Sequence, residues 1–325
     1  MGLSVITLLS GINQADQFFG VSGSLLIPLR GLSLCVRQVL LRTVKTILEE
    51  PEGCWSVKSA LVNLLAIVVT ATDNLNQNIL LEYFMQADLF TSLTRLLHTE
   101  VKSERDFDTQ YQALQVLSLL SYFQKFEQIN TYSHSMRQAA DKELLQDIVV
   151  IFEHQLEQLK SQGAISDPAS LFERFSTFVS FWSAPTEEKP SYLIPGMSIF
   201  LLCLYDWVHE NAPFRRMICG RQNRREGGCE VSLLLRLLLQ FAAGIFAEVN
   251  HLYQACYTKM CMIILLCLTE DQDCAYLLHD PEIFSGVLSP LEGAKSNGKQ
   301  PVICTILDLC TTFNRDSADR SADIN

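Results

Sequence analysis

The sequence contains none of the short motifs that mark common catalytic sites or nucleotide sites. It has no glycine-rich phosphate loop, no GxGxxG fingerprint, no GxSxG elbow and no HExxH zinc motif. Its 6 histidines are scattered along the chain, without a pair at the spacing of two ligands on one helix. These absences favour a protein without enzymatic activity and predict no bound cofactor or metal.

Basic residues are also in short supply. The chain has 25 Lys and Arg against 36 Asp and Glu, which gives a formal net charge of −11. Binding nucleic acid requires a surplus of positive charge, because the protein must neutralise phosphates. The balance therefore argues against a nucleic-acid partner.

No CxxC pair occurs, although the chain has 11 cysteines. The absence of close pairs excludes a zinc ribbon and a thioredoxin-like redox site. The cysteine count is odd, and several cysteines lie inside apolar helical stretches, where a thiol behaves as a small hydrophobic group. We expect reduced, structural cysteines in a cytosolic protein; the clearest examples are Cys203, Cys256, Cys261, Cys267 and Cys304.

Long apolar runs are missing as well. The longest charge-free run, Met260–Leu268, would cover about 13–14 Å as a helix, which is less than half of a bilayer core. The longer segment Val231–Ala247 is interrupted by Arg236 and Gln240. The N-terminus has no positive residue before Arg30, so it does not resemble a signal peptide. We therefore expect a cytoplasmic chain without a membrane-spanning segment.

What the sequence does have is helical periodicity, with 48% hydrophobic residues and only 15 Gly and 10 Pro. The segment Val57–Val69 is apolar around nearly its whole circumference, which is typical of a helix covered by neighbours on several sides. The polar turn Thr70–Asn74 can cap a following helix, which we expect over Asn76–Met85.

A third helix is expected to begin at Leu89, with Asp88 as its N-cap residue. The order of one buried helix, one short helix and one leucine-rich helix resembles the armadillo type of repeat. The glycine usual in the second turn is missing, and Ala87 and Asp88 stand in its place. Such a repeat has more apolar surface than it can cover alone, so stacked neighbours must bury it.

The same pattern continues along the chain and predicts an all-α fold, an armadillo-like or HEAT-like α-solenoid of stacked helices. The charged link 100–108 is expected to be a solvated loop. Further helices are expected over residues 35–48, 111–123, 141–160, 171–182, 197–209, 231–249, 252–268 and 302–309.

Composition suggests a division of the chain into two helical blocks joined by a flexible linker, APTEEKP, in which two prolines disfavour helix. The predicted division is a poorly ordered N-terminal segment 1–34, a first helical-repeat block 35–183, a linker 184–190, a second helical-repeat block 191–313 and a disordered tail 314–325.

An arginine cluster stands out in this acidic chain. It consists of Arg215, Arg216, Arg221, Arg224 and Arg225. Guanidinium groups pair well with phosphate and carboxylate, so the cluster is a candidate contact for a phosphoinositide headgroup or an acidic partner. The alternative is a mobile, solvated loop between two helices.

Four stretches together resemble, in the same order, the armadillo-like helical domain-containing protein 3 family. They are VVTATDNLNQNILLEYFM (68–85), LSLLSYFQKFEQIN (117–130), FLLCLYDWVHENAPF (200–214) and KMCMIILLCLTEDQDCAYLLHD (259–280). The resemblance covers roughly residues 35–309. Family members are about twice as long, so the chain is expected to correspond to their central portion, without the C-terminal half and its membrane-spanning segment.

The resemblance implies a cytosolic-facing, Golgi membrane-associated protein that takes part in Golgi maintenance and secretion. It implies binding to a type III beta phosphatidylinositol 4-kinase and to a Golgi guanine-nucleotide exchange factor for Arf GTPases. It transfers no catalytic or ligand-binding residue to this chain.

Three hypotheses follow. The first is a non-enzymatic scaffold that presents a helical surface to these protein partners through hydrophobic hot spots flanked by charge. The second is a module that binds phosphoinositides or anionic membranes through the arginine cluster. The third is a fragment that is unstable without further repeats, because an uncapped solenoid end exposes its core.

Overall fold

In the computed structural model of the chain, the described residues are 34–51, 53–70, 81, 84–85, 87–123, 129–161, 196–223, 228–230, 232–247, 252–280, 302–304, 306–308 and 310–311. Nearly all of them are helical, and the fold class is all-α and armadillo-like, as the sequence predicts. Residues 1–33 of the expected segment 1–34 lie outside the described residues, as do the expected segments 184–190 and 314–325 and the expected helix 171–182.

The chain divides into two compact units, which we describe separately. The described residues up to Ser135 belong to unit 1 and those from Met136 onward belong to unit 2, so the division falls within α8 (Thr131–Gln138). The two blocks expected on either side of residues 184–190 remain a prediction, because the proposed linker is not among the described residues.

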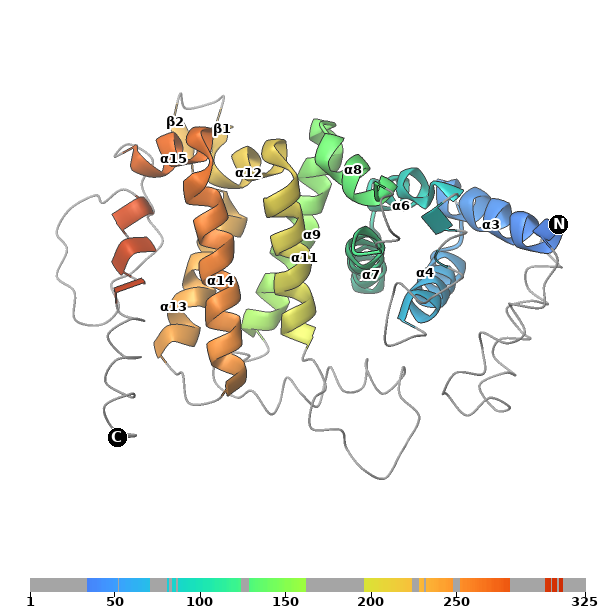
Figure 1. The fold of residues 1–325 in the computed structure, drawn as a ribbon, viewed down its shortest axis with the longest axis horizontal. Helices are drawn as coiled ribbons and strands as arrows, with labels where there is room; N and C mark the ends of the chain where they lie inside the picture. The colour runs from blue at the N-terminus through green and yellow to red at the C-terminus, as the bar shows by residue number, and fades with distance from the viewer. Residues whose placement is uncertain are drawn as a thin grey trace. The chain divides into compact units, whose positions relative to one another are not determined.

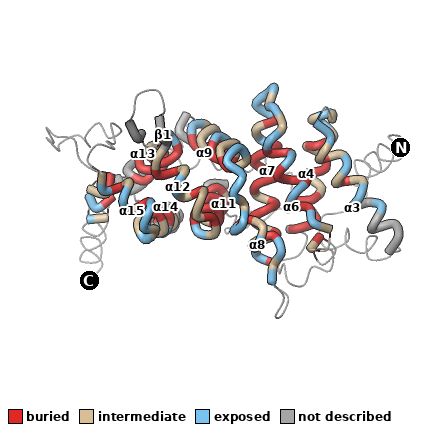
Figure 2. Tube along the Cα trace, turned by 90° about the horizontal axis from the view of Figure 1, so that it is seen from above, coloured by how far each residue is buried: buried red, intermediate tan, exposed pale blue. Residues whose placement is uncertain are grey.

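Unit 1 is built from pairs of stacked helices (Figure 1). Helix α3 (Leu34–Glu49) packs against α6 (Leu89–Leu97), and α4 (Trp55–Thr70) packs against α7 (Glu104–Ser121). The helices therefore form two layers, and Figure 2 shows buried residues where α4 and α7 lie side by side. The apolar circumference expected for α4 is explained by these contacts with neighbouring helices.

Unit 2 repeats the arrangement and adds short helices at one end. Helix α11 (Gly196–Glu210) lies along α14 (Leu252–Glu270), and α9 (Lys142–Ser161) packs against α13 (Leu233–Ala247). Helix α12 (Ala212–Cys219) packs against α15 (Gln272–His279). This last pair lies across one end of the long helices (Figure 1).

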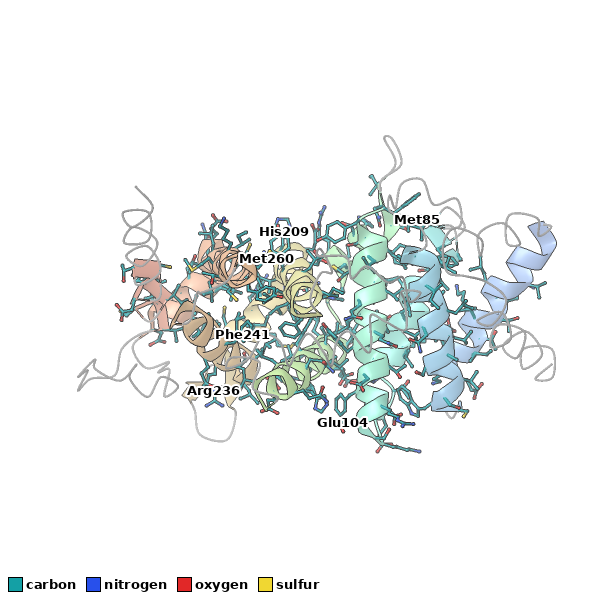
Figure 3. The ribbon with its side chains drawn as sticks, turned by 90° about the horizontal axis from the view of Figure 1, so that it is seen from below. Met85, Glu104, His209, Arg236, Phe241 and Met260 are labelled. Carbon is teal, nitrogen blue, oxygen red and sulfur yellow. The ribbon has the colours of Figure 1, made fainter. Side chains whose placement is uncertain are left out.

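Aromatic side chains fill the centre of unit 2. Phe152 of α9 meets Phe200 of α11 edge to face, with ring centroids 5.7 Å apart. Trp207 and Phe214, both fully buried, lie 5.8 Å apart and connect α11 to α12. Each such pair contributes about 0.5–1.5 kcal/mol beyond the burial of its surface. Phe241 of α13 is also buried, and Figure 3 shows it between the α11–α14 side and the opposite side, where Arg236 lies.

Two short strands depart from the purely helical prediction. Strands β1 (Arg221–Asn223) and β2 (Gly228–Glu230) pair in antiparallel register, with Arg221 opposite Glu230. They follow α12 and precede α13, so the arginine-rich connection is anchored at both ends by backbone pairing.

The prediction of a solvated loop over 100–108 is wrong, because α7 already begins at Glu104. Ser103 is its extended N-cap residue, and the Asp106 carboxylate accepts the backbone N–H groups of Lys102 and Ser103, each at 3.0 Å. A carboxylate three residues into a helix satisfies amides that would otherwise lack partners. The charged residues of this segment therefore form the N-terminus of a helix.

The turn that lacks the usual glycine is held in an unexpected way. Asp88 precedes α6, as predicted, but it adopts the left-handed conformation (φ 46°) and its side chain caps no backbone amide. Instead, Leu89 N–H donates to the Tyr132 hydroxyl at 3.2 Å, and that hydroxyl donates to the Phe84 carbonyl at 2.8 Å. Burial raises the pKa of Tyr132, which keeps its hydroxyl protonated as a donor. A tyrosine from α8 thus stabilises a turn for which glycine is the ordinary solution.

Candidate interaction sites

The short helices share one kind of N-terminal residue. Asn130 precedes α8, Asn211 precedes α12 and Asp271 precedes α15, and the side-chain oxygen of each accepts backbone N–H groups from the first turn. Such caps stabilise a helix by about 1 kcal/mol. In each case the remaining polar atom of the same side chain reaches another helix, and the contact of Asp271 is with Arg215 of the predicted arginine cluster.

Asn211 connects α12 to α8. Its Nδ2 donates to the carbonyls of Met136 and Ala139, each at 2.7 Å, while its Oδ1 accepts Phe214 N–H at 2.7 Å. The residue is fully buried. A single amide therefore completes the C-terminus of one short helix and the N-terminus of another.

Arg215 makes the corresponding connection from α12 to α15. Its Nε donates to Asp271 Oδ2 at 3.0 Å, and its Nη1 donates to the carbonyls of Val208 and His209 at 2.7 and 2.9 Å. Burial disfavours the charged form of Asp271, but the Cys274 N–H and the Arg215 guanidinium outweigh it, so the pKa of this carboxyl is lowered. The Arg215 guanidinium is thus engaged within the fold.

The other four arginines of the cluster are placed differently. Arg216 forms an exposed ion pair with Asp273, with 3.1 Å between Nε and Oδ2. Arg221 lies in β1, and residues 224 and 225 are outside the described part of the chain. Sequence spacing could not reveal the partners of Arg215 and Arg216, because Asp271 and Asp273 lie more than 50 residues further along the chain. Anion binding by the cluster stays a prediction.

A hollow in unit 1 was not expected from the sequence. It has a volume of about 680 Å³ and opens where α3, α4, α6 and α7 begin or end. Its edge carries charges of both signs, and Arg95 pairs with Glu49, which also accepts the Ser92 hydroxyl at 2.7 Å. We call this site the Trp55 hollow; its lining residues are Glu49, Pro51, Gly53, Trp55, Arg95, His98, Thr99, Glu100 and Lys102.

A buried lysine lies next to this hollow. Lys58 is fully buried, and its ammonium lies 5.5 Å from the centre of the Trp55 ring. Within the described part of the chain, this ammonium has no hydrogen-bond partner. Burial lowers the pKa of Lys58, and the negative charge of Glu50 opposes that shift only in part. The side chain also lies close to Gly53, where an added Cβ would be 3.0 Å from its Cε. A charged group therefore occupies a position on α4 that the apolar pattern predicts to be core.

Replacing Lys58 by methionine is expected to stabilise the chain. A buried charge without a hydrogen bond destabilises the folded state, whereas Met fills similar space; we expect a gain of about 1–2 kcal/mol at pH 7, after the loss of the contact with Trp55. In the folded state the pKa of Lys58 lies below the ordinary 10.5, so the free energy of unfolding of the wild type rises as the pH climbs toward that value. The advantage of Lys58→Met over the wild type should therefore shrink with rising pH. Urea unfolding at pH 7 and pH 10 measures both effects.

Exposed Lys142, at the start of α9, provides the matched control. Lys142→Met should change the free energy of unfolding by less than about 0.5 kcal/mol. A Lys58→Met variant less stable than wild type at pH 7 would contradict the expected cost of the buried ammonium.

Within the described ranges, no group of three or more His, Cys, Asp and Glu side chains is placed to hold a metal ion. Over the same residues, no helix is both long enough and apolar enough to span a bilayer.

The stacked helix pairs and the capped short helices define the class: an armadillo-like helical-repeat protein. Among curated proteins, the chain is similar in sequence to armadillo-like helical domain-containing protein 3. The Homo sapiens protein is 24% identical over 96% of this chain and 49% of its own length; the Danio rerio and Xenopus laevis proteins are 25% and 24% identical, each over 81% of this chain and 44% of their length. The resemblance to these proteins that the sequence indicates is thus confirmed.

The chain spans about half the length, or slightly less, of these curated relatives. No family profile matches it. No solved structure matches it either.

Proposed function

We propose that the chain is a non-enzymatic helical-repeat scaffold that binds protein partners at the cytosolic face of Golgi membranes. The proposed partners are a type III beta phosphatidylinositol 4-kinase and a Golgi Arf exchange factor, and the proposed process is Golgi maintenance and secretion. The Trp55 hollow is the proposed contact surface. The observation that carries this assignment is a half-buried tryptophan beside an exposed arginine at a concave surface.

Tryptophan and arginine are the side chains that most often dominate binding energy at protein interfaces. In the Trp55 hollow, the ring supplies apolar area, while Arg95 and Lys102 are exposed and able to pair with acidic groups of a partner. Glu49 and Glu100 add negative charge at the same edge, so the hollow favours a partner surface that carries both signs.

The test is capture of the purified kinase and the purified exchange factor by this chain. Wild type should retain at least one of them, and Arg95→Glu/Lys102→Glu should weaken that capture about thirtyfold, the loss expected when an interface hot spot is removed. Arg42→Glu/Lys142→Glu, which changes the net charge by the same amount at exposed positions elsewhere, should leave capture unchanged. Circular dichroism melting curves should show that both double variants are folded.

Two outcomes would overturn the proposal. Failure of folded wild-type chain to retain either partner removes the scaffold function. Equal capture by the two double variants removes the Trp55 hollow as the contact surface.

A further inference from the structure

An unpaired stripe of side chains runs along α14 in unit 2. Lys259, Ile263, Leu266 and Glu270 are all exposed, and Ile263 and Leu266 retain 42% and 54% of their accessible surface. They follow one another at steps of four, three and four residues. That spacing places them in one line on a helix, as in the seam of a coiled coil.

The stripe faces away from the core of unit 2. The buried residues of α14 alternate with it; they include Cys261, Ile264, Leu265 and Leu268. Figure 3 shows Met260 of α14 and His209 of α11 on the same side of this unit, opposite Arg236 of α13. Because Ile263 and Leu266 are exposed, another helix can pack against the stripe from outside unit 2.

The order of the stripe is basic, apolar, apolar, acidic. Its charged ends and its two apolar residues are centred on the same point, between Ile264 and Leu265. A second α14 packed antiparallel about a two-fold axis through that point would place Lys259 against the partner copy's acidic end. It would also place Ile263 against the partner copy's leucine. The stripe is thus complementary to itself, which a two-fold interface requires.

We infer that the chain forms a symmetric homodimer through antiparallel packing of two α14 helices. Burying Ile263 and Leu266 supplies the apolar contact, and two symmetric Lys259–Glu270 pairs set the direction and register. Among the described residues, neither Lys259 nor Glu270 takes part in an ion pair, so both charges are available to a second copy. One helix face is a small interface, so the dimer is weak and concentration-dependent.

This inference is independent of the proposed scaffold function, since the Trp55 hollow and the α14 stripe lie in different units. Loss of dimerisation would leave capture of the kinase and exchange factor unchanged. Each proposal can therefore fail without the other.

Sedimentation velocity over a range of chain concentrations tests the dimer. The expected result is a mass that rises from the 36.7 kDa monomer toward twice that value, with the association weakened by added salt. Leu266→Asp should weaken association at least about thirtyfold. Val150→Asp on α9 is the matched control, because Val150 is an apolar residue of similar exposure, 38%, on another helix.

Charge exchange tests the antiparallel geometry. Lys259→Glu alone and Glu270→Lys alone should each weaken association about tenfold, because two like charges then oppose one another across each symmetric pair. The double variant Lys259→Glu/Glu270→Lys should restore association to the wild-type level. Only a self-pairing stripe predicts this rescue.

Three results would overturn the inference: a constant monomer mass at all concentrations, unchanged association of Leu266→Asp, or failure of the double charge exchange to restore it. Monomeric wild type whose Leu266→Asp variant loses capture of the kinase or exchange factor would show that a different protein covers the stripe.

Discussion

Replacing Asn211 with alanine is expected to lower the free energy of unfolding by about 3–4 kcal/mol. The substitution removes the cap on Phe214 N–H and leaves the carbonyls of Met136 and Ala139 without their donor inside the protein. A lost cap costs about 1 kcal/mol, and each buried polar group left unpaired adds about 1 kcal/mol or more. Urea unfolding followed by circular dichroism measures the change.

Two further variants separate the two roles of this side chain. Asn211→Ser keeps an oxygen that can cap α12 but lacks the amide donors to α8, so it should recover only about 1 kcal/mol of the loss. Asn130→Ala removes similar hydrogen bonds at a half-buried residue, where water can reach the freed groups more easily, and should cost about 1–2 kcal/mol. Equal losses for Asn130→Ala and Asn211→Ala would contradict the importance of burial.

Replacing Arg215 with alanine should cost about 2–4 kcal/mol. The Arg215 side chain is only 18% exposed and that of the paired Asp271 14%, so the variant leaves the Asp271 carboxylate and the carbonyls of Val208 and His209 without their partner. Arg216→Ala is the natural control, because its ion pair with Asp273 is exposed and such pairs contribute about 0–1 kcal/mol. Urea unfolding of both variants at pH 7 should separate them clearly.

The effect of Arg215→Ala should also depend on pH. The folded pKa of Asp271 lies below its ordinary 3.8, so the ion pair stabilises the fold above that value and the contribution is lost as the pH falls through the folded pKa. The difference between wild type and variant should therefore narrow below about pH 4. A difference that stays constant into the acid range would mean that Arg215 acts through its carbonyl contacts alone.

Because Arg215 is expected to stabilise the fold, it is a poor position at which to test anion binding by the arginine cluster. Charge reversal at Arg215 would damage the fold, and any loss of lipid binding could follow from unfolding. The informative variant changes Arg221, Arg224 and Arg225 to glutamate and leaves Arg215 intact. Unchanged flotation with vesicles of phosphatidylcholine and phosphatidylinositol phosphate would remove Arg221, Arg224 and Arg225 as a lipid site.

Helix positions were predictable wherever a long segment is rich in apolar residues. The expected helices 141–160, 197–209 and 252–268 agree with α9, α11 and α14 to within two residues at each end. The first shows amphipathic spacing, whereas the other two are long apolar runs.

The sequence could not predict contacts between residues that lie far apart in the chain. The hydroxyl of Tyr132 replaces a missing glycine by reaching a turn more than 40 residues earlier, and Arg215 looks like a free cation until Asp271 is seen beside it. The Trp55 hollow lies where four helices begin or end, so no local sequence motif could predict it. Lys58 was missed because a buried lysine contradicts the pattern that predicts the helix around it.

The double use of the capping side chains has a consequence for how the chain melts. Asn211 completes α8 as well as α12, and Asp271 holds Arg215 of α12 as well as the first turn of α15. None of these short helices can open without exposing polar groups of its neighbour, which raises the cost of fraying from either side. Helices of eight residues, too short to be stable by themselves, are thereby bound into one cooperative unit.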